Sequence, residues 1–241
     1  DLSRTDAVLA LGSGVVGDLA GFAASIYMRG ISFLQVPTTL LSMIDSSVGG
    51  KTGVNSSAGK NRVGSFYQPS GVLIDSGVLK TLPAREITAG LCEAVKQGVL
   101  SGRELFNLTS DFLTKYPTAG IAGNFSKREF GNATDSLIAA QVGFKASIVR
   151  GDERESTGRM DSHSRKILNF GHTFAHALEK VTDYKRFKHG EAVGYGILYA
   201  ARLSKILDLI GGDVVNLLYD VVYRTGTLPS LDGIAAKDIF E

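Results

Sequence analysis

Three of the chain's four histidines, His172, His176 and His189, lie in one short stretch that also holds Glu179, and Glu93 lies far upstream in an apolar segment. Two imidazoles and one carboxylate form a ligand set that catalytic zinc sites use, with a further position left open. His172 and His176 are four residues apart, so on a helix their rings lean to one face, and spacing alone nominates this pair as ligands. The same pair would also suit a packed polar helix face without metal. The stretch predicts a metal site and leaves open which two imidazoles bind.

A glycine-rich segment, residues 12–18, follows the strand-like run Ala7–Leu11 and leads into the apolar run Leu19–Ile26. Glycines at a strand-to-helix turn let the backbone approach a pyrophosphate, and the helix N-terminus attracts the anion. An ordinary strand-to-helix turn would show the same pattern, and the acidic residue that would hold a ribose about 20 positions further on is missing. The segment predicts a dinucleotide site whose ribose contact comes from elsewhere.

A second glycine-rich stretch, Asp45–Gly53, contains Gly-Lys-Thr but lacks the glycine that a nucleoside triphosphate loop needs five positions before Gly50. Lys51, Lys60 and Asn61 then lie on segments that we expect to be flexible loops. One interpretation is that these charged side chains lie on surface loops and are simply solvated. The other is close contact with a phosphorylated or carboxylated small molecule, which the glycines would allow.

Glu93 and Lys96 are three residues apart on a predicted helix, a spacing common in exposed ion pairs. Their apolar neighbours indicate burial instead, and Glu and Lys are rarely buried without a partner. Further along the chain, Arg165 and Asn169 lie just ahead of His172. We therefore expect charged and polar side chains from distant segments to meet around the histidines.

Apolar periodicity changes near Thr81. Strand-like runs precede it, at Ala7–Leu11, Ser32–Val36 and Val72–Ile74. Helical runs follow it, at Pro83–Val99, Arg103–Tyr116, Ala133–Val149, Thr173–Val181, Ala192–Leu207 and Asp213–Tyr223, and residues 117–127 are predicted as a loop. The predicted fold class is α/β, with an incomplete Rossmann-like parallel sheet in residues 1–80 followed by a mostly α-helical metal-binding domain in residues 81–241.

Composition limits the partners of this 241-residue chain. Its 44% hydrophobic content suffices for a large core, and a formal charge of +2 is too small for a general nucleic-acid binder. No apolar run reaches the roughly 18 residues that suggest a membrane span. The single cysteine, Cys92, suits a reducing compartment. We expect a cytoplasmic protein with a small-molecule substrate and no nucleic-acid or membrane partner; a plastid is the alternative for a plant sequence, because any targeting segment ahead of Asp1 would be unseen.

As an ordered set, the motifs resemble the 3-dehydroquinate synthase family of the shikimate pathway, within the sugar phosphate cyclases. The resemblance is carried by residues 14–22, 28–30, 35–41, 45–53, 59–61, 66–69, 79–83, 93–96, 152–155, 169–173 and 189–193. It implies a homodimeric lyase that depends on NAD and a metal and converts 3-deoxy-D-arabino-heptulosonate 7-phosphate into 3-dehydroquinate and phosphate. The implied steps are transient oxidation by NAD, phosphate elimination, reduction and intramolecular aldol closure.

The resemblance also implies residue roles. The ligands of Zn²⁺, or alternatively Co²⁺, would be Glu93, His172 and His189, so that His176 faces the substrate. The NAD-binding positions would be Gly14, Val15, Val16, Gly17, Asp18, Thr38, Thr39, Lys51, Lys60, Val78, Leu79, Lys80 and Thr81. The substrate-binding and catalytic positions would be Arg29, Asp45, Lys51, Asn61, Lys96, Lys145, Arg165, Asn169 and His176.

Three alternatives remain open at this point, because the family pattern extends further at both ends. The chain could come from a sister cyclase that makes valiolone or deoxyinosose precursors, from a metal-dependent polyol dehydrogenase, or be a catalytically incomplete NAD-binding fragment. Asn169 and His176 favour the dehydroquinate branch over the sister cyclases, whose substrates lack the carboxylate.

Overall fold

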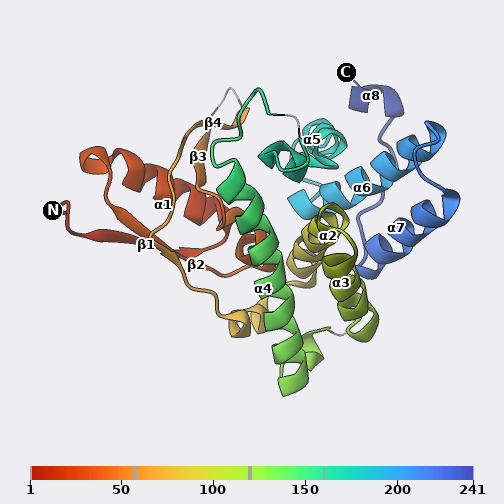
Figure 1. Ribbon diagram of the computed structural model, residues 1–241, viewed down its shortest axis with the longest axis horizontal. Coiled ribbons are helices and arrows are strands. Elements are labelled where there is room, and N and C mark those ends of the chain that lie inside the picture. Colours follow the sequence, from red (N-terminus) through yellow and green to blue (C-terminus); the bar gives the residue numbers. More distant parts are fainter. Residues whose placement is uncertain (1, 57–58, 119–120, 160, 241) are drawn as a thin grey trace.

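The computed structural model describes residues 2–56, 59–118, 121–159 and 161–240, except for the side chains of residues 59–61, 122 and 240 (Figure 1). Its first part is a parallel sheet of β1 (Ala7–Gly12), β2 (Ser32–Pro37) and β5 (Gly71–Val72), in the order β1-β2-β5. The predicted parallel strands are confirmed, although β5 is shorter than its apolar run and begins one residue earlier.

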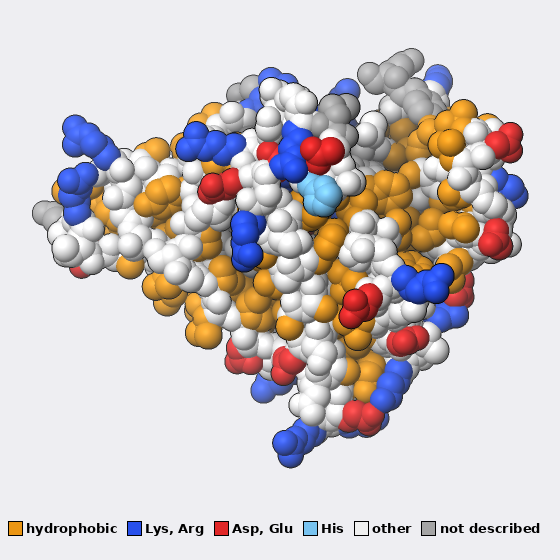
Figure 2. Space-filling model, viewed as in Figure 1, with side chains coloured by type: hydrophobic (Ala, Val, Ile, Leu, Met, Phe, Trp, Pro, Cys, Tyr) orange, Lys and Arg blue, Asp and Glu red, His pale blue; other side chains and the backbone are white. Residues whose placement is uncertain are grey.

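α1 (Gly14–Ile26) covers one face of this sheet. Phe33 and Gln35 point toward it and are buried, and Gly17 lets the helix approach, because an added Cβ there would lie 2.4 Å from Oε1 of Gln35. The opposite face carries Leu9 and Leu34, which pair across the sheet and are 62% and 39% exposed. Figure 2 shows hydrophobic side chains gathered on this side of the molecule.

β3 (Lys51–Ser56) and β4 (Gly59–Phe66) form an antiparallel hairpin that packs against α1. The prediction of flexible loops here was wrong. Gly53 and Gly64 pair across the hairpin, and an added Cβ at Gly64 would lie 2.1 Å from the Thr52 carbonyl oxygen, so the strands need these glycines to pair closely. Lys51 begins β3. Lys60 and Asn61 belong to β4, but their side chains lie outside the described part.

The rest of the described chain is largely helical. It contains α2 (Ala84–Ser101), α3 (Arg103–Lys115), α4 (Arg128–Gly151), α5 (His172–Val181), α6 (His189–Ile206), α7 (Gly212–Arg224), α8 (Ala236–Phe240), the 3-10 turns η1 (Tyr27–Arg29), η3 (Ser76–Thr81), η4 (Ile121–Asn124) and η5 (Arg165–Asn169), and the π-helical turn η2 (Ser42–Ser46). The predicted helices are confirmed, with α4 beginning five residues and α6 three residues earlier than expected. Each helix in the described ranges is too short or too polar to span a lipid bilayer.

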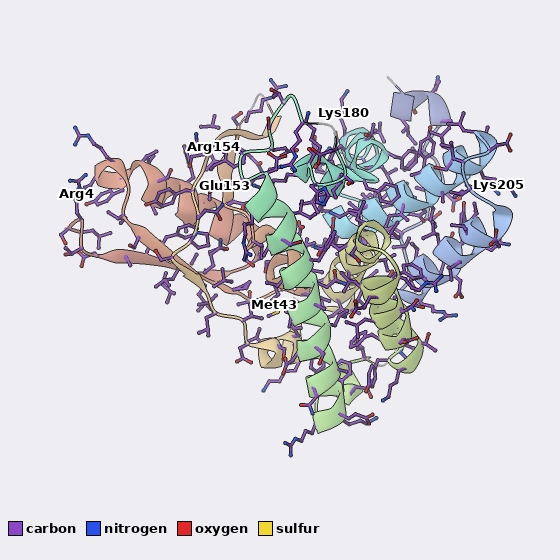
Figure 3. The ribbon with its side chains drawn as sticks, in the orientation of Figure 1. Arg4, Met43, Glu153, Arg154, Lys180 and Lys205 are labelled. Carbon is purple, nitrogen blue, oxygen red and sulfur yellow. The ribbon has the colours of Figure 1, made fainter. Side chains whose placement is uncertain are left out.

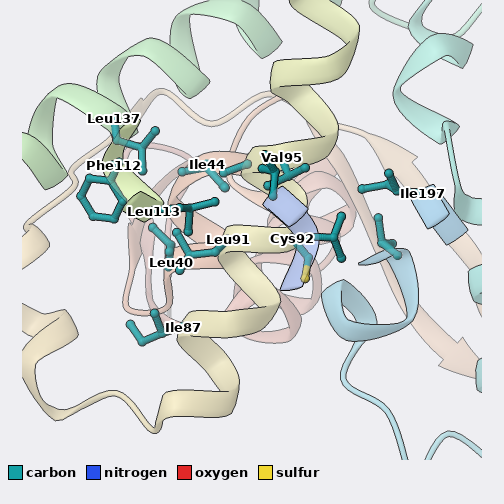
Figure 4. Packing of buried hydrophobic residues seen from close by; sticks show 14 of the residues in the cluster. Leu40, Ile44, Ile87, Leu91, Cys92, Val95, Phe112, Leu113, Leu137 and Ile197 are labelled. Atoms are coloured by element: carbon teal, nitrogen blue, oxygen red, sulfur yellow. The ribbon is translucent and has the colours of Figure 1, made fainter. Parts of the chain in front are cut away.

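The main hydrophobic core surrounds α2, whose Leu91, Cys92 and Val95 are almost completely buried. Leu40 and Ile44, from the segment between β2 and β3, pack into the same cluster (Figure 4). η2 thus joins the helical core although it precedes residue 80, and it also lies against α4. The division into domains at residues 80 and 81 stays a prediction.

Candidate metal centre and anion-binding site

Glu93 and Lys96 lie one turn apart on α2 and are 0% and 2% exposed. Oε2 of Glu93 lies 2.6 Å from Nζ of Lys96. Burial opposes the charge on Lys96, but the nearby carboxylates of Glu93 and Asp45 prevail and raise the pKa of this lysine. Neither oxygen of Glu93 accepts a well-aligned hydrogen bond from a described residue, and Oε1 lacks even the contact with Lys96. A buried carboxylate oxygen without a partner is costly, so this atom indicates that a cation or donor belongs beside it.

Two imidazoles converge on that oxygen. His172 begins α5 and His189 begins α6, and their Nε2 atoms lie 3.8 and 3.6 Å from Oε1 of Glu93. One candidate ligand atom from each of the three residues falls within 4.8 Å of the others. The geometry therefore fits the two-nitrogen, one-oxygen donor set that the resemblance implied for Zn²⁺ or Co²⁺.

His172 is held in the form that binds metals. Its Nδ1 lies 3.1 Å from the Phe170 carbonyl oxygen, which can only accept, so Nδ1 carries the proton and the Nε2 lone pair faces Glu93. Burial, together with the positive charge of Lys96, lowers the pKa of His172 to about 4. The ring is neutral at pH 7.

His176 lies one turn after His172 on α5 and is exposed. The centroids of these two rings are 5.4 Å apart, so the pair nominated by spacing does lie together. Within the described residues, however, the donor group that includes Glu93 contains His172 and His189, whereas His176 groups with Glu179 and His189. The distances agree with the ligand set implied by the resemblance, which stays a prediction.

A second ion pair, between buried Lys145 and partly exposed Asp45, lies beside the first. η2 carries Asp45 to α4, where Nζ of Lys145 lies 2.8 Å from Oδ1 of Asp45 and also donates to the Asp45 carbonyl. Burial opposes ionisation of Asp45, but the charges of Lys145 and Lys96 hold its pKa well below the usual range. Gln97 of α2 donates to the Ile44 carbonyl at 3.1 Å, so η2 is fixed to two helices. π-helical turns are frequent at functional sites, and this one had no signature in the apolar pattern.

Glu155, in the loop after α4, joins two predicted site residues. It forms an ion pair with Lys51 and accepts a hydrogen bond from Nδ2 of Asn169 at 2.9 Å. Burial works against ionisation of Glu155, but these two partners lower its pKa overall. No role was predicted for Glu155 from the sequence, although it belongs to residues 152–155, one of the motifs shared with the 3-dehydroquinate synthase family.

Arg165 lies at the same loop and is 2% exposed. Its Nη1 donates to the Glu153 carbonyl at 2.5 Å, and its guanidinium lies over the Phe66 ring, 5.7 Å from the centroid. Figure 3 places Glu153 between the end of α4 and the hairpin. Gly49 makes room for the arginine, because its φ is +110° and an added Cβ would lie 2.4 Å from Nη2. A guanidinium held in this way suits a phosphate or carboxylate oxygen.

The predicted dinucleotide segment lies at the carboxyl edge of the sheet. Gly14 begins α1 directly after β1, and the Thr38 amide donates to the Gly12 carbonyl at 2.9 Å, so the glycine turn and Thr38 are neighbours. This edge is where parallel α/β sheets bind ligands. Asp18, in the next turn of α1, has its pKa raised to about 6 by burial, while Lys145 opposes and Asp45 adds to the shift.

The predicted roles of three further groups of site residues stay predictions. Arg29 is exposed at the turn between α1 and β2, so it lies at the amino edge of the sheet, whereas Asp45 follows the carboxyl edge. Val78 to Thr81 form most of η3, which packs against α4. The side chains of Lys60 and Asn61 lie outside the described part.

Comparison with known proteins finds a family model for each part of the chain. Residues 1–89 match the family model described as 3-dehydroquinate synthase N-terminal, and residues 90–240 match the one described as 3-dehydroquinate synthase C-terminal. The 3-dehydroquinate synthase of Solibacter usitatus is 45% identical over 98% of this chain, which spans 62% of that relative's length.

Solved structures of sugar phosphate cyclases share the fold, including two that contain NAD+ and a metal ion. A 2-deoxy-scyllo-inosose synthase complexed with carbaglucose-6-phosphate, NAD+ and Co2+ superposes with a TM-score of 0.84 at 30% identity, over 99% of this chain and 61% of that one. The 2-epi-5-epi-valiolone synthase of Streptomyces hygroscopicus with NAD+ and Zn2+ bound gives 0.79 at 31% identity, over 96% and 60%. The predicted fold class is confirmed. Because the family models cover the chain from residue 1 to residue 240, the chain belongs to the 3-dehydroquinate synthase family.

Proposed function

We propose that the protein to which this chain belongs converts 3-deoxy-D-arabino-heptulosonate 7-phosphate into 3-dehydroquinate and phosphate, using NAD and Zn²⁺ or Co²⁺. The observation that carries the proposal is the convergence of two imidazole nitrogens on the unpartnered Oε1 of Glu93, beside buried Lys96. Membership of the 3-dehydroquinate synthase family supports the identity of this substrate. The cyclase structures named with NAD+ and Co2+ or Zn2+ support the cofactors.

Glu93, His172 and His189 would hold the metal, and Gly14 to Asp18 with Thr38 and Thr39 would receive the dinucleotide. When bound, the metal would orient and acidify adjacent substrate hydroxyls, and NAD would take up a hydride and return it. The fit of the metal rests on the buried carboxylate oxygen that has no described partner. The fit of NAD rests on the glycine turn at the carboxyl edge of the sheet, next to Thr38.

The chain's cations would hold the substrate's anionic groups in place. Lys145 and Arg165 are both buried, and each is held by a partner, Lys145 by Asp45 and Arg165 by the Glu153 carbonyl. Such preorganised donors bind phosphate or carboxylate oxygens without first having to order themselves. The substrate's own phosphate oxygen would accept the proton that is removed in the elimination, so these side chains need only position it.

Asn169 and His176 would face the substrate groups that distinguish the dehydroquinate branch. His176 is exposed, and Asn169 reaches the Lys51–Glu155 ion pair. A carboxylate-bearing substrate could therefore meet donors from α5, η5 and β3 at once.

The test is phosphate release from the heptulosonate phosphate, with NAD and zinc, by the full-length protein and by this chain, each with a chelated control. Metal-dependent release by the full-length protein without net NADH is expected. Accumulation of NADH without phosphate would favour a polyol dehydrogenase. Release only from a sugar phosphate without a carboxylate would favour a sister cyclase, and either result would overturn the proposal.

The predicted homodimer, cytoplasmic location and absence of a nucleic-acid partner belong to the same proposal. The last is supported by the formal charge of +2 and by the interspersed acidic and basic side chains in Figure 2. Light scattering of the full-length protein should give twice the monomer mass.

A further inference from the structure

Both imidazoles of the candidate metal site are held at the nitrogen that faces away from Glu93. In His172 the holding group is the Phe170 carbonyl, 3.1 Å from Nδ1. In His189 it is a side chain, since Oε2 of Glu179 lies 3.4 Å from Nδ1. The two rings begin different helices, yet each presents Nε2 to the same carboxylate oxygen.

We propose that Glu179 is a positioning residue that fixes the Nδ1–H form of His189 and directs its Nε2 lone pair toward Glu93. An ionised carboxylate can only accept a hydrogen bond, so the proton of the neutral ring must lie on Nδ1 and Nε2 is left free to bind a cation. Outer carboxylates of this kind orient metal-binding histidines and raise their basicity. The inference rests on the metal site of the proposed function.

The burial of Glu179 supports this role. The residue is 3% exposed and lies on the same buried face of α5 as Ala175 and Leu178. Removing a carboxylate from water is unfavourable unless a partner compensates, and His189 supplies a donor. The carboxylate would also add a second negative charge, after that of Glu93, close to a divalent cation.

Glu179 is better placed to orient His189 than to bind the metal in place of Glu93. It can form a donor group with His176 and His189, but it faces the Nδ1 side of the His189 ring, whereas Glu93 faces the Nε2 side. A ring that donates Nδ1–H to Glu179 binds a cation only through Nε2. That nitrogen lies beside the carboxylate oxygen that has no described hydrogen-bond partner.

The test compares Glu179→Ala and Glu179→Gln with wild type. Gln keeps an acceptor and removes the charge, so it separates orientation from electrostatics. The matched control is Asp183→Asn, which removes a carboxylate that follows the same helix and is 83% exposed, at a φ of +53° that Asn tolerates. Circular dichroism and thermal unfolding verify that each variant folds.

The first measurement is the tautomer of the neutral His189 ring in the metal-free chain, from long-range ¹H–¹⁵N correlation spectra. The spectra are recorded at alkaline pH, because burial opposes protonation of this ring but the carboxylates of Glu179 and Glu93 outweigh it and raise the pKa. Wild type, Glu179→Gln and Asp183→Asn should show the Nδ1–H form, and Glu179→Ala should shift toward Nε2–H. The second is zinc affinity by competition with a chelator. Glu179→Ala should bind zinc about 10- to 100-fold more weakly than wild type, and the affinity of Glu179→Gln should lie between the two. The zinc affinity of Asp183→Asn should stay within about twofold of wild type.

An unchanged tautomer together with unchanged zinc affinity in Glu179→Ala would overturn the inference. If Glu179→Ala does not fold, wild-type zinc affinity in Glu179→Gln combined with an Nε2–H form of His189 in wild type would overturn it equally. Failure of wild type to bind zinc would instead contradict the metal site of the proposed function. In that case the tautomer spectra alone would still decide the role of Glu179.

Discussion

Glu93 and Lys96 form an ion pair closed to solvent on one face of α2, with 2.6 Å between Oε2 and Nζ. The pair uses only one of the two carboxylate oxygens. The other faces the Nε2 atoms of His172 and His189, so a single buried carboxylate can be neutralised by a lysine on one side and by a metal on the other. Stability and metal binding should therefore be coupled through Glu93.

Replacing Lys96 with Met tests that coupling. Without metal, the variant leaves the Glu93 charge buried and without its cation, which should cost about 3–5 kcal/mol of unfolding free energy. Zinc should bind and restore most of the loss, because it supplies the missing positive charge, while substrate turnover should fall. Urea unfolding in chelator and in excess zinc measures both states.

Lys115→Met is the matched control, since Lys115 pairs with Glu129 on the surface, where both side chains are more than half exposed. Its unfolding free energy should differ little from that of wild type, and this small difference should be the same in chelator and in excess zinc. If Lys96→Met lost the same free energy with and without zinc, the proposed coupling would be wrong.

Gly49→Ala should disturb Arg165 specifically. The backbone at residue 49 has a φ of +110°, which alanine rarely adopts. The added methyl group would also lie 2.4 Å from Nη2 of Arg165. Backbone strain of this kind costs on the order of 1–3 kcal/mol, and the displaced guanidinium should bind inorganic phosphate several-fold more weakly. Thermal unfolding and calorimetric titration with phosphate measure the two effects.

Gly102→Ala separates the effect of backbone strain from the effect of the steric clash with Arg165. Gly102 has a φ of +98°, but nothing lies within 4 Å of an added Cβ. This variant should lose comparable stability and keep its phosphate affinity. Equal phosphate affinities of the two variants would show that Arg165 does not depend on Gly49.

Asp18→Asn should stabilise the protein at neutral pH but not in acid. The pKa of Asp18 is raised from 3.8 to about 6, so its stabilising contribution is present below about pH 4 and is lost as the pH rises through 6. Asn resembles the protonated form and avoids that loss. Since Asp18 is partly exposed, we expect a gain of about 1–2 kcal/mol at pH 7.5 and almost none at pH 4. A difference in unfolding free energy that does not vary with pH would contradict the shift.

Local pattern predicted the helices and the parallel strands but not the hairpin. α2 and α7 carry apolar residues at three or four spacing, and their predicted bounds lie within two residues of those observed. β3 contains Lys, Thr, Gly, Asn and Ser with one valine, so no apolar alternation marks it as a strand. Its pairing depends on glycines that let two backbones approach closely. In the sequence alone, the same glycines indicate a flexible loop.

The candidate site shows the same limit. Spacing could pair His172 with His176, because both lie on α5, but it could not choose His189 over His176, since His189 reaches Glu93 only through the packing of α5, α6 and α2. Asp45 and Lys145 lie 100 residues apart and meet because η2 packs against α4. The family motifs supplied these residues where local spacing could not.

Zinc stoichiometry of four single variants tests the central claim most directly, because His172 and His176 lie one turn apart on the same helix. We expect His172→Ala to lose bound zinc and turnover together, as Glu93→Ala should, whereas His176→Ala should keep one zinc per chain while turnover falls. His163→Ala, at a side chain that is 76% exposed, is the control and should keep both. Loss of zinc from His176→Ala with full retention in His172→Ala would contradict the ligand set of Glu93, His172 and His189.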